Sequence, residues 1–189
     1  MTREIKEYYY SKLLDYQQWK LKGEQLIAAA ELLEPKIQEY FIDLSDWANK
    51  KKAYPVMDDR YNSTYFMLMS FAIENLLKAM LVKYKYSDID TEFKKTSRLP
   101  NILKSHDLFD LSLKAGLEEF ALENEDYLKR LTRSSIWYGR YPISIDPNSM
   151  EVVVYSEYQD EPILLSSYSS MDSKWIKRII DDLMGRLSA

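Results

Sequence analysis

A long stretch between Asn62 and Tyr86 is apolar almost all the way round a helix. Its polar exceptions near the middle are Glu74, Asn75 and Lys78. A helix that is apolar on every side must be covered by other elements, so this stretch is predicted to be the central, most buried helix of the fold. The charges at mid-span disfavour a membrane helix, because ionisable groups are costly in the hydrocarbon core.

The rest of the chain mostly repeats apolar residues at spacings of three and four, which predicts further helices. Only 4 glycines and 6 prolines occur in 189 residues, which favours long regular elements over turn-rich β structure. The predicted helices span residues 3 to 33, 34 to 49, 62 to 86, 105 to 115, 124 to 138 and 170 to 187. Residues 87 to 104 are predicted to be a polar connection. Gly23 marks either a break or a packing contact, and Pro35 either begins a helix or kinks a longer one.

The pattern changes between residues 142 and 170. Two short apolar runs, 143 to 145 and 152 to 155, flank Asp146-Pro147-Asn148, which is a weak hairpin signal. A long structured loop is the alternative. The sequence therefore predicts one all-α domain over residues 1 to 189, a helical bundle with a small β-hairpin or loop insertion before its last helix.

Composition excludes several classes of protein. The net charge of −4 and the pI of about 5.2 exclude a strongly basic DNA-coating protein, although a local basic patch remains compatible. The chain has no cysteine, which rules out disulfides and zinc–cysteine sites and fits a reducing cytoplasm. The first twenty residues lack the apolar core of a signal peptide, so a cytoplasmic protein is expected. No spacing typical of a metal or phosphate-loop site occurs, so neither a metal nor a cofactor is expected.

A basic and aromatic stretch covers residues 129 to 142. Its candidate binding residues are Lys129, Arg130, Arg133, Trp137, Tyr138 and Arg140. Guanidinium groups beside aromatic rings favour an anion or nucleic-acid site, because they combine charge with stacking surfaces. The alternative is that the cations form surface ion pairs with Glu125 and Asp126, which contribute little. For Arg140, burial beside a carboxylate such as Glu74 is a further alternative.

Glu74, Lys78 and His106 are the other candidate binding residues. Glu74 and Lys78 are four residues apart, in the order that favours an ion pair on a helix. One interpretation is that they form a polar pocket, with every group hydrogen-bonded, inside the bundle or at a dimer seam. The other is that they face the arginines across a cleft and help to shape a ligand site. His106 is the only histidine, and its ordinary role is structural. An acid–base role for His106 requires Glu74 or an arginine to meet it through the fold.

Three segments together resemble the HEPN-like superfamily of helical bundles. They are Phe71-Ala-Ile-Glu-Asn-Leu-Leu-Lys-Ala-Met-Leu81, then His106-Asp-Leu with Gly116-Leu117, and finally Trp137-Tyr-Gly-Arg-Tyr-Pro142. The resemblance implies a helical bundle of a kind found in prokaryotic toxin–antitoxin and defence systems. It also implies a homodimer, because the ribonucleases of the superfamily act at a dimer cleft on RNA ribose and phosphate.

The resemblance also implies where a catalytic pair would lie. HEPN ribonucleases carry an arginine, four to six further residues, and then a histidine. Counted from Arg133, the histidine would fall at residues 138 to 140, and counted from Arg130 at residues 135 to 137; neither register supplies one. An arginine stays protonated and is a poor base, so no catalytic residue is assigned.

The expected function is therefore that of a non-catalytic, HEPN-like binding or regulatory protein. Its expected partners are RNA or a nucleotide, an antitoxin-type protein and a second copy of the chain. No association with a membrane is expected. Two alternatives stay open. One is a metal-independent ribonuclease with a displaced acid–base set, such as His106 with Arg133. The other is a homodimeric scaffold whose only role is assembly, which an exposed tyrosine-rich helix face would favour.

Overall fold

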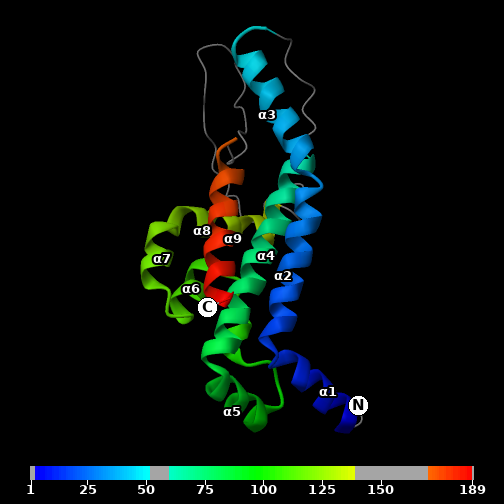
Figure 1. Ribbon diagram of the computed structural model, residues 1–189, viewed down its shortest axis with the longest axis vertical. Helices are drawn as coiled ribbons and strands as arrows, with labels where there is room; N and C mark the ends of the chain where they lie inside the picture. The colour runs from blue at the N-terminus through cyan, green and yellow to red at the C-terminus, as the bar shows by residue number, and fades with distance from the viewer. Residues whose placement is uncertain (1–2, 52–59, 139–169, 189) are drawn as a thin grey trace.

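The computed structural model describes residues 3–51, 60–138 and 170–188, and this part of the chain is all-α (Figure 1). The predicted all-α class is confirmed. The predicted insertion between residues 142 and 170 falls, except for its last residue, outside the described residues. The helices are α1 (Arg3–Leu13), α2 (Tyr16–Glu31), α3 (Glu34–Ala48), α4 (Arg60–Tyr84), α5 (Tyr86–Thr96), α6 (Leu108–Lys114), α7 (Glu118–Glu123), α8 (Glu125–Arg133) and α9 (Asp172–Ser188). Two shorter elements are the 3-10 turn η1 (Asn101–Leu103) and the π-helix η2 (Ser134–Tyr138).

The helix α4 is the centre of the fold, as the sequence predicts. It lies between α2 and α9 in Figure 1, and it also contacts α6, α8 and η2. Its side chains from Tyr65 to Val82 include the largest completely buried ones of the described residues. Between Tyr61 and Tyr84 it has the length and hydropathy of a membrane-spanning helix, but 78% of its most apolar window is buried inside the protein. Burial by neighbouring helices therefore accounts for its apolar character.

Close packing between α2 and α4 depends on Gly23. A Cβ atom at this position would lie 3.0 Å from the Leu76 Cδ2 atom and 3.2 Å from the Ala72 carbonyl oxygen. The packing alternative for Gly23 is thus confirmed.

The prediction of one helix from residue 3 to 33 is wrong, because α1 ends before Asp15. The Asp15 carboxylate accepts a hydrogen bond from the Gln17 backbone N–H at 3.0 Å and so begins α2 as its N-cap.

Two short helices, α5 and α7, occupy residues that were not predicted to be helical. The predicted connection from residue 87 to 104 is mostly α5, which buries Ile89 and ends at Ser97 in the left-handed region with φ 51°. The helix α6 begins after Asp107, not after Ser105, because the Asp107 carboxylate accepts from the Asp110 backbone N–H at 3.0 Å. Gly116, with φ 77°, follows α6 as predicted.

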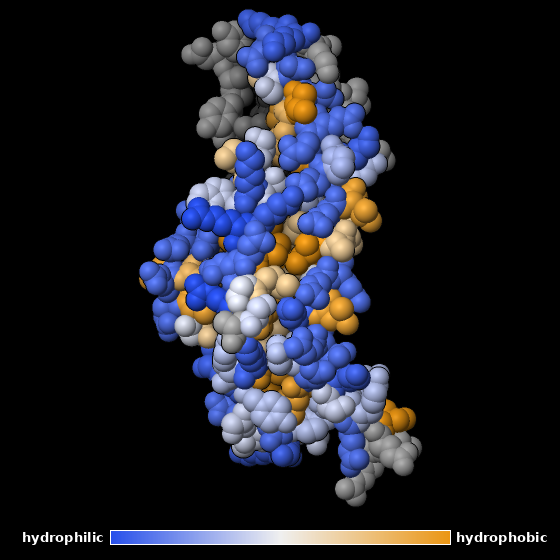
Figure 2. All heavy atoms as spheres, viewed as in Figure 1, coloured by the Kyte–Doolittle hydropathy of each residue, from blue (hydrophilic) through white to orange (hydrophobic). Residues whose placement is uncertain are grey.

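The face of the molecule seen in Figure 2 is mostly hydrophilic, with hydrophobic side chains in separate places. Scattered apolar residues of this kind are normal on a monomeric surface. On α1, however, Tyr8 and Tyr9 are 61% and 63% exposed. Both are more exposed than Tyr84 and Tyr86, which are 53% and 51% exposed.

Candidate functional site

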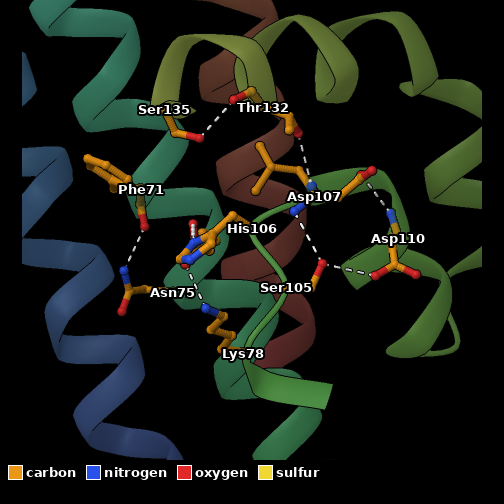
Figure 3. Close-up of polar contacts among 11 residues, drawn as sticks. Phe71, Asn75, Lys78, Ser105, His106, Asp107, Asp110, Thr132 and Ser135 are labelled. Carbon is orange, nitrogen blue, oxygen red and sulfur yellow. Dashed lines mark hydrogen bonds and ion pairs between the residues drawn. The ribbon is translucent and has the colours of Figure 1, made fainter. Parts of the chain in front are cut away.

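Three of the predicted site residues meet on α4. The Lys78 Nζ atom donates to the Glu74 Oε1 atom at 2.6 Å, one helical turn away. The His106 Nδ1 atom lies 3.0 Å and 3.1 Å from the two Glu74 carboxylate oxygens, across 32 residues of sequence. Figure 3 shows the His106 ring lying against α4 close to Lys78. We call Glu74, Lys78 and His106 the α4 polar cluster.

Burial makes the pairing in the α4 polar cluster necessary. Glu74 and Lys78 are only 6% and 4% exposed, and a buried charge is costly unless it is paired. The Lys78 ammonium group also lies 5.8 Å from the centroid of the Trp19 ring on α2. The predicted ion pair and the predicted satisfied pocket are both confirmed for Glu74 and Lys78. His106 completes the pocket from the outside, since its side chain is 59% exposed.

Local hydrogen bonds fix the segment that carries His106. Ser105 donates through its hydroxyl to the Asp110 carboxylate at 3.0 Å, and Asp107 caps α6 (Figure 3). The Leu108 backbone N–H donates to the Thr132 hydroxyl at 3.0 Å, which joins the start of α6 to α8. His106 is therefore held on both sides along the chain. This fixed position lets Glu74 orient the imidazole with one ring nitrogen bonded and the other, Nε2, available for a different contact.

The cations of α8 are used in ion pairs. Lys129 pairs with Glu125, as the ion-pair alternative predicts, and its hydrogen bond to that carboxylate raises the pKa of Lys129. Arg130 pairs with Asp172 of α9, with N–O distances of 3.1 Å and 3.3 Å. The Asp172 side chain is 2% exposed, so this ion pair joins α8 to α9 in a largely desolvated place.

Aromatic rings extend this contact along α9. The Arg130 guanidinium lies 4.6 Å from the centroid of the Tyr127 ring, which stacks on Trp175 at 5.4 Å. The Arg178 guanidinium lies 5.3 Å from the Trp175 ring. Burial, aided by the negative charge of Asp172, raises the pKa of the Tyr127 phenol. Asp172, Trp175 and Arg178 were not predicted as site residues, although their spacing of three places them on one side of a helix.

The stretch after Arg130 departs from a regular α-helix. Arg133 is the last residue of α8 and is half-buried, and residues 134 to 138 form the π-helix η2 against α4. The Ser134 and Ser135 hydroxyls donate to the backbone carbonyls of Arg130 and Thr132 at 3.3 Å and 2.9 Å. Short π-helical segments often occur at functional sites, because they change the direction of the side chains that follow.

In the described part of the chain, only some of the predicted site residues come together. Glu74, Lys78 and His106 meet, whereas Lys129 and Arg130 bind carboxylates of their own. For Trp137 and Tyr138 the structure gives only the backbone, as part of η2, and Arg140 lies outside the described residues. Within residues 3–51, 60–138 and 170–188, no group of three or more histidine or acidic side chains is arranged to hold a metal ion.

No protein-family model, no curated protein and no solved structure matches this chain. The assignment of function therefore rests on the geometry above and on the resemblance of the three sequence segments.

Proposed function

We propose that this protein is a non-catalytic, HEPN-like helical module that acts by binding RNA or a nucleotide, as a cytoplasmic homodimer in a toxin–antitoxin or defence system. The contacts around α4 support the HEPN-like part of this proposal. Glu74 lies in the first segment of the resemblance and His106 in the second, and a hydrogen bond joins them. The third segment begins in η2, which packs on α4. The first two segments of the resemblance, and the two residues of the third that the structure describes, are thus neighbours in space.

The use of the single histidine supports the non-catalytic part. The chain has 1 histidine, and its Nδ1 atom is bonded to the buried Glu74 carboxylate. Arg130 is likewise bonded to the buried Asp172 carboxylate. Both groups hold helices together, and no second imidazole exists to complete the arginine–histidine pair of the superfamily's ribonucleases. Cleavage of RNA needs a base for the 2′-hydroxyl and an acid for the leaving oxygen.

The binding part of the proposal concerns Lys129, which is exposed on α8, and Arg140, which follows α8 in the sequence. The Lys129–Glu125 pair is solvent-exposed, with side chains 51% and 40% exposed, and such pairs contribute little to stability. Lys129 can therefore exchange its carboxylate for a phosphate at small cost. Arg130 cannot do so without leaving Asp172 buried and unpaired. Lys129 and Arg140, not Arg130, are the residues that we expect to contact phosphate.

Titration of a labelled RNA oligonucleotide over a series of NaCl concentrations tests this proposal. We expect binding that weakens as salt rises, and a salt dependence that falls by about one phosphate contact in Lys129→Gln and again in Arg140→Gln. Lys94→Gln is the matched control, because Lys94 forms the same kind of exposed ion pair with Asp90 on α5. Failure of the wild type to bind RNA or a mononucleotide at low salt would remove both ligands from the proposal.

One observation favours a second candidate, the displaced acid–base set. Glu74 orients His106 through Nδ1, and the Nε2 atom of the exposed imidazole makes no hydrogen bond to a described residue, which leaves it open to a substrate. An RNA-cleavage assay in EDTA distinguishes the two candidates. The non-catalytic proposal expects intact RNA with the wild type. Cleavage that disappears in His106→Ala, whose exposed side chain can be removed without unpairing Lys78, would instead establish the acid–base candidate.

A further inference from the structure

A hollow opens between α9 and the corner where α7 meets α8. Its volume is about 470 Å³, within the range of small-molecule sites. The buried rings and chains of Phe120 and Ile179, 3% and 2% exposed, form its apolar base. Trp175 contributes a wall that is already held in place by its stack on Tyr127. The base is thus preformed and apolar.

The polar lining of the hollow carries both signs of charge. Asp182 is occupied, because it accepts two hydrogen bonds from Arg186 at 2.8 Å and 3.2 Å. Arg178 and Glu123 also line the hollow, and neither makes an ion pair or a hydrogen bond to any described residue. The Arg178 guanidinium is nevertheless positioned, by its contact with the Trp175 ring at 5.3 Å.

These features select the charge of a ligand. Because Arg186 already neutralises Asp182, a phosphate or a polyanion would meet the Arg178 guanidinium together with the Glu123 carboxylate, which repels it. A ligand with only a positive charge would leave Arg178 unpaired. A ligand that carries one anionic and one cationic group satisfies both free side chains. An apolar body on the same ligand lies against Trp175, which is 36% exposed, beside the nearly buried Phe120 and Ile179.

We propose that this hollow binds a small zwitterion with an apolar body, of the chemical class of a free α-amino acid. The ligand carboxylate pairs with the Arg178 guanidinium, whose planar donors match it. The ligand ammonium group pairs with Glu123, and the ligand side chain lies against Trp175. This site is separate from the α4 polar cluster and from Lys129, so the proposal stands or fails independently of the proposed function.

Calorimetric titration of the full chain with phenylalanine and leucine tests the proposal. Phenylpropionate, which lacks the ammonium group, and phenylethylamine, which lacks the carboxylate, are the matched ligands. We expect phenylalanine to bind at least about tenfold more tightly than either, because each loses one charged hydrogen-bonded contact. Arg178→Gln and Glu123→Gln should each weaken phenylalanine binding by a similar factor. Both side chains are exposed, so circular dichroism should show an intact fold.

Two further variants control for general effects of charge. Lys174→Gln and Glu118→Gln remove exposed charges from α9 and α7 outside the lining, and both should bind phenylalanine like the wild type. The proposal is overturned if neither amino acid binds, or if phenylpropionate or phenylethylamine binds as tightly as phenylalanine. It is also overturned if the control variants weaken binding as much as Arg178→Gln does.

Discussion

At the scale of single residues, the Glu74 carboxylate binds two other ionisable side chains. It neutralises Lys78 within α4 and holds His106 from the segment before α6. It is buried, so neither role can be taken over by water. The spacing of Glu74 and Lys78 was enough to predict their ion pair from the sequence. The contact with His106 was only one of several alternatives, because no local pattern connects residues 32 positions apart.

Removing Glu74 should therefore strongly destabilise the fold. Glu74→Leu leaves the Lys78 ammonium group buried without a partner, and we expect a loss of about 3–5 kcal/mol in the free energy of unfolding. The double variant Glu74→Leu/Lys78→Met removes both charges and should be more stable than Glu74→Leu alone. Urea denaturation measures both. A double variant that is less stable than the single one would contradict the account of this pair.

Tyr65 shows the opposite situation, a buried polar atom without a partner. Its side chain is 0% exposed, and its hydroxyl makes no hydrogen bond to any residue that the structure describes. Burial raises the pKa of the Tyr65 phenol far above its ordinary value of 10.0, and Glu34 and Glu31 raise it further. The folded state therefore keeps the proton that the unfolded state releases above that value, so the wild type should lose stability as the pH rises past it.

Tyr65→Phe should stabilise the protein, because it removes the unpaired hydroxyl and keeps the ring. We expect a gain of about 1–3 kcal/mol at neutral pH. The difference between the variant and the wild type should widen above pH 10.0, since only the wild type has this proton to lose. Urea denaturation at neutral and alkaline pH measures the difference. A difference in the free energy of unfolding that narrows with rising pH would show that the pKa of the Tyr65 phenol is not raised in the folded state.

At the scale of elements, periodicity predicted the long helices well and the short ones poorly. The apolar pattern of α4 extends over seven turns, and no alternative to a buried helix fits it. The break before α2 was missed because it depends on one capping bond from Asp15, which a count of apolar spacings does not detect. The helix α5 was missed because Ile89 is its only buried residue among polar neighbours. Arg130 was assigned to local carboxylates because its real partner, Asp172, is 42 residues away.

Two glycines inside helices test the packing of α2 on α4. A Cβ atom at Gly23 would crowd Leu76 and the Ala72 carbonyl, whereas at Gly185 in α9 nothing lies within 4 Å. Both substitutions gain the same helix propensity, roughly 0.5–1 kcal/mol. Gly185→Ala should therefore stabilise the protein, and Gly23→Ala should be less stable than Gly185→Ala by about 1 kcal/mol or more. Thermal unfolding of the pair measures this difference, and equal stabilisation would contradict the close contact.

At the scale of the whole molecule, the segment before α6 and the π-helix η2 both lie against α4, although the three are far apart in the sequence. The proposed homodimer rests on the resemblance to HEPN-like proteins and not on this packing. The all-α class could be predicted because few glycines and prolines and steady apolar spacings leave little room for sheets. The association of two copies could not be derived from the residues, because it depends on a complementary surface and not on periodicity.

Multi-angle light scattering over a concentration series tests the homodimer. We expect a mass of twice that of the chain, since the proposed binding surface belongs to a dimeric module. Tyr8→Ser/Tyr9→Ser removes the exposed tyrosines of α1 and shows whether this surface takes part. A monomeric mass at all concentrations would remove both the dimeric module and the scaffold alternative.

The contact on which the polar cluster depends is the bond between the buried Glu74 carboxylate and the His106 Nδ1 atom, which joins the segment before α6 to α4. Long-range proton–nitrogen NMR of the imidazole tests it directly, because the chain has 1 histidine and gives one set of ring signals. For the neutral ring we expect the proton on Nδ1, shared with the Glu74 carboxylate, and a change in these signals in Glu74→Gln. A ring protonated on Nε2, with signals that Glu74→Gln leaves unchanged, would contradict the account.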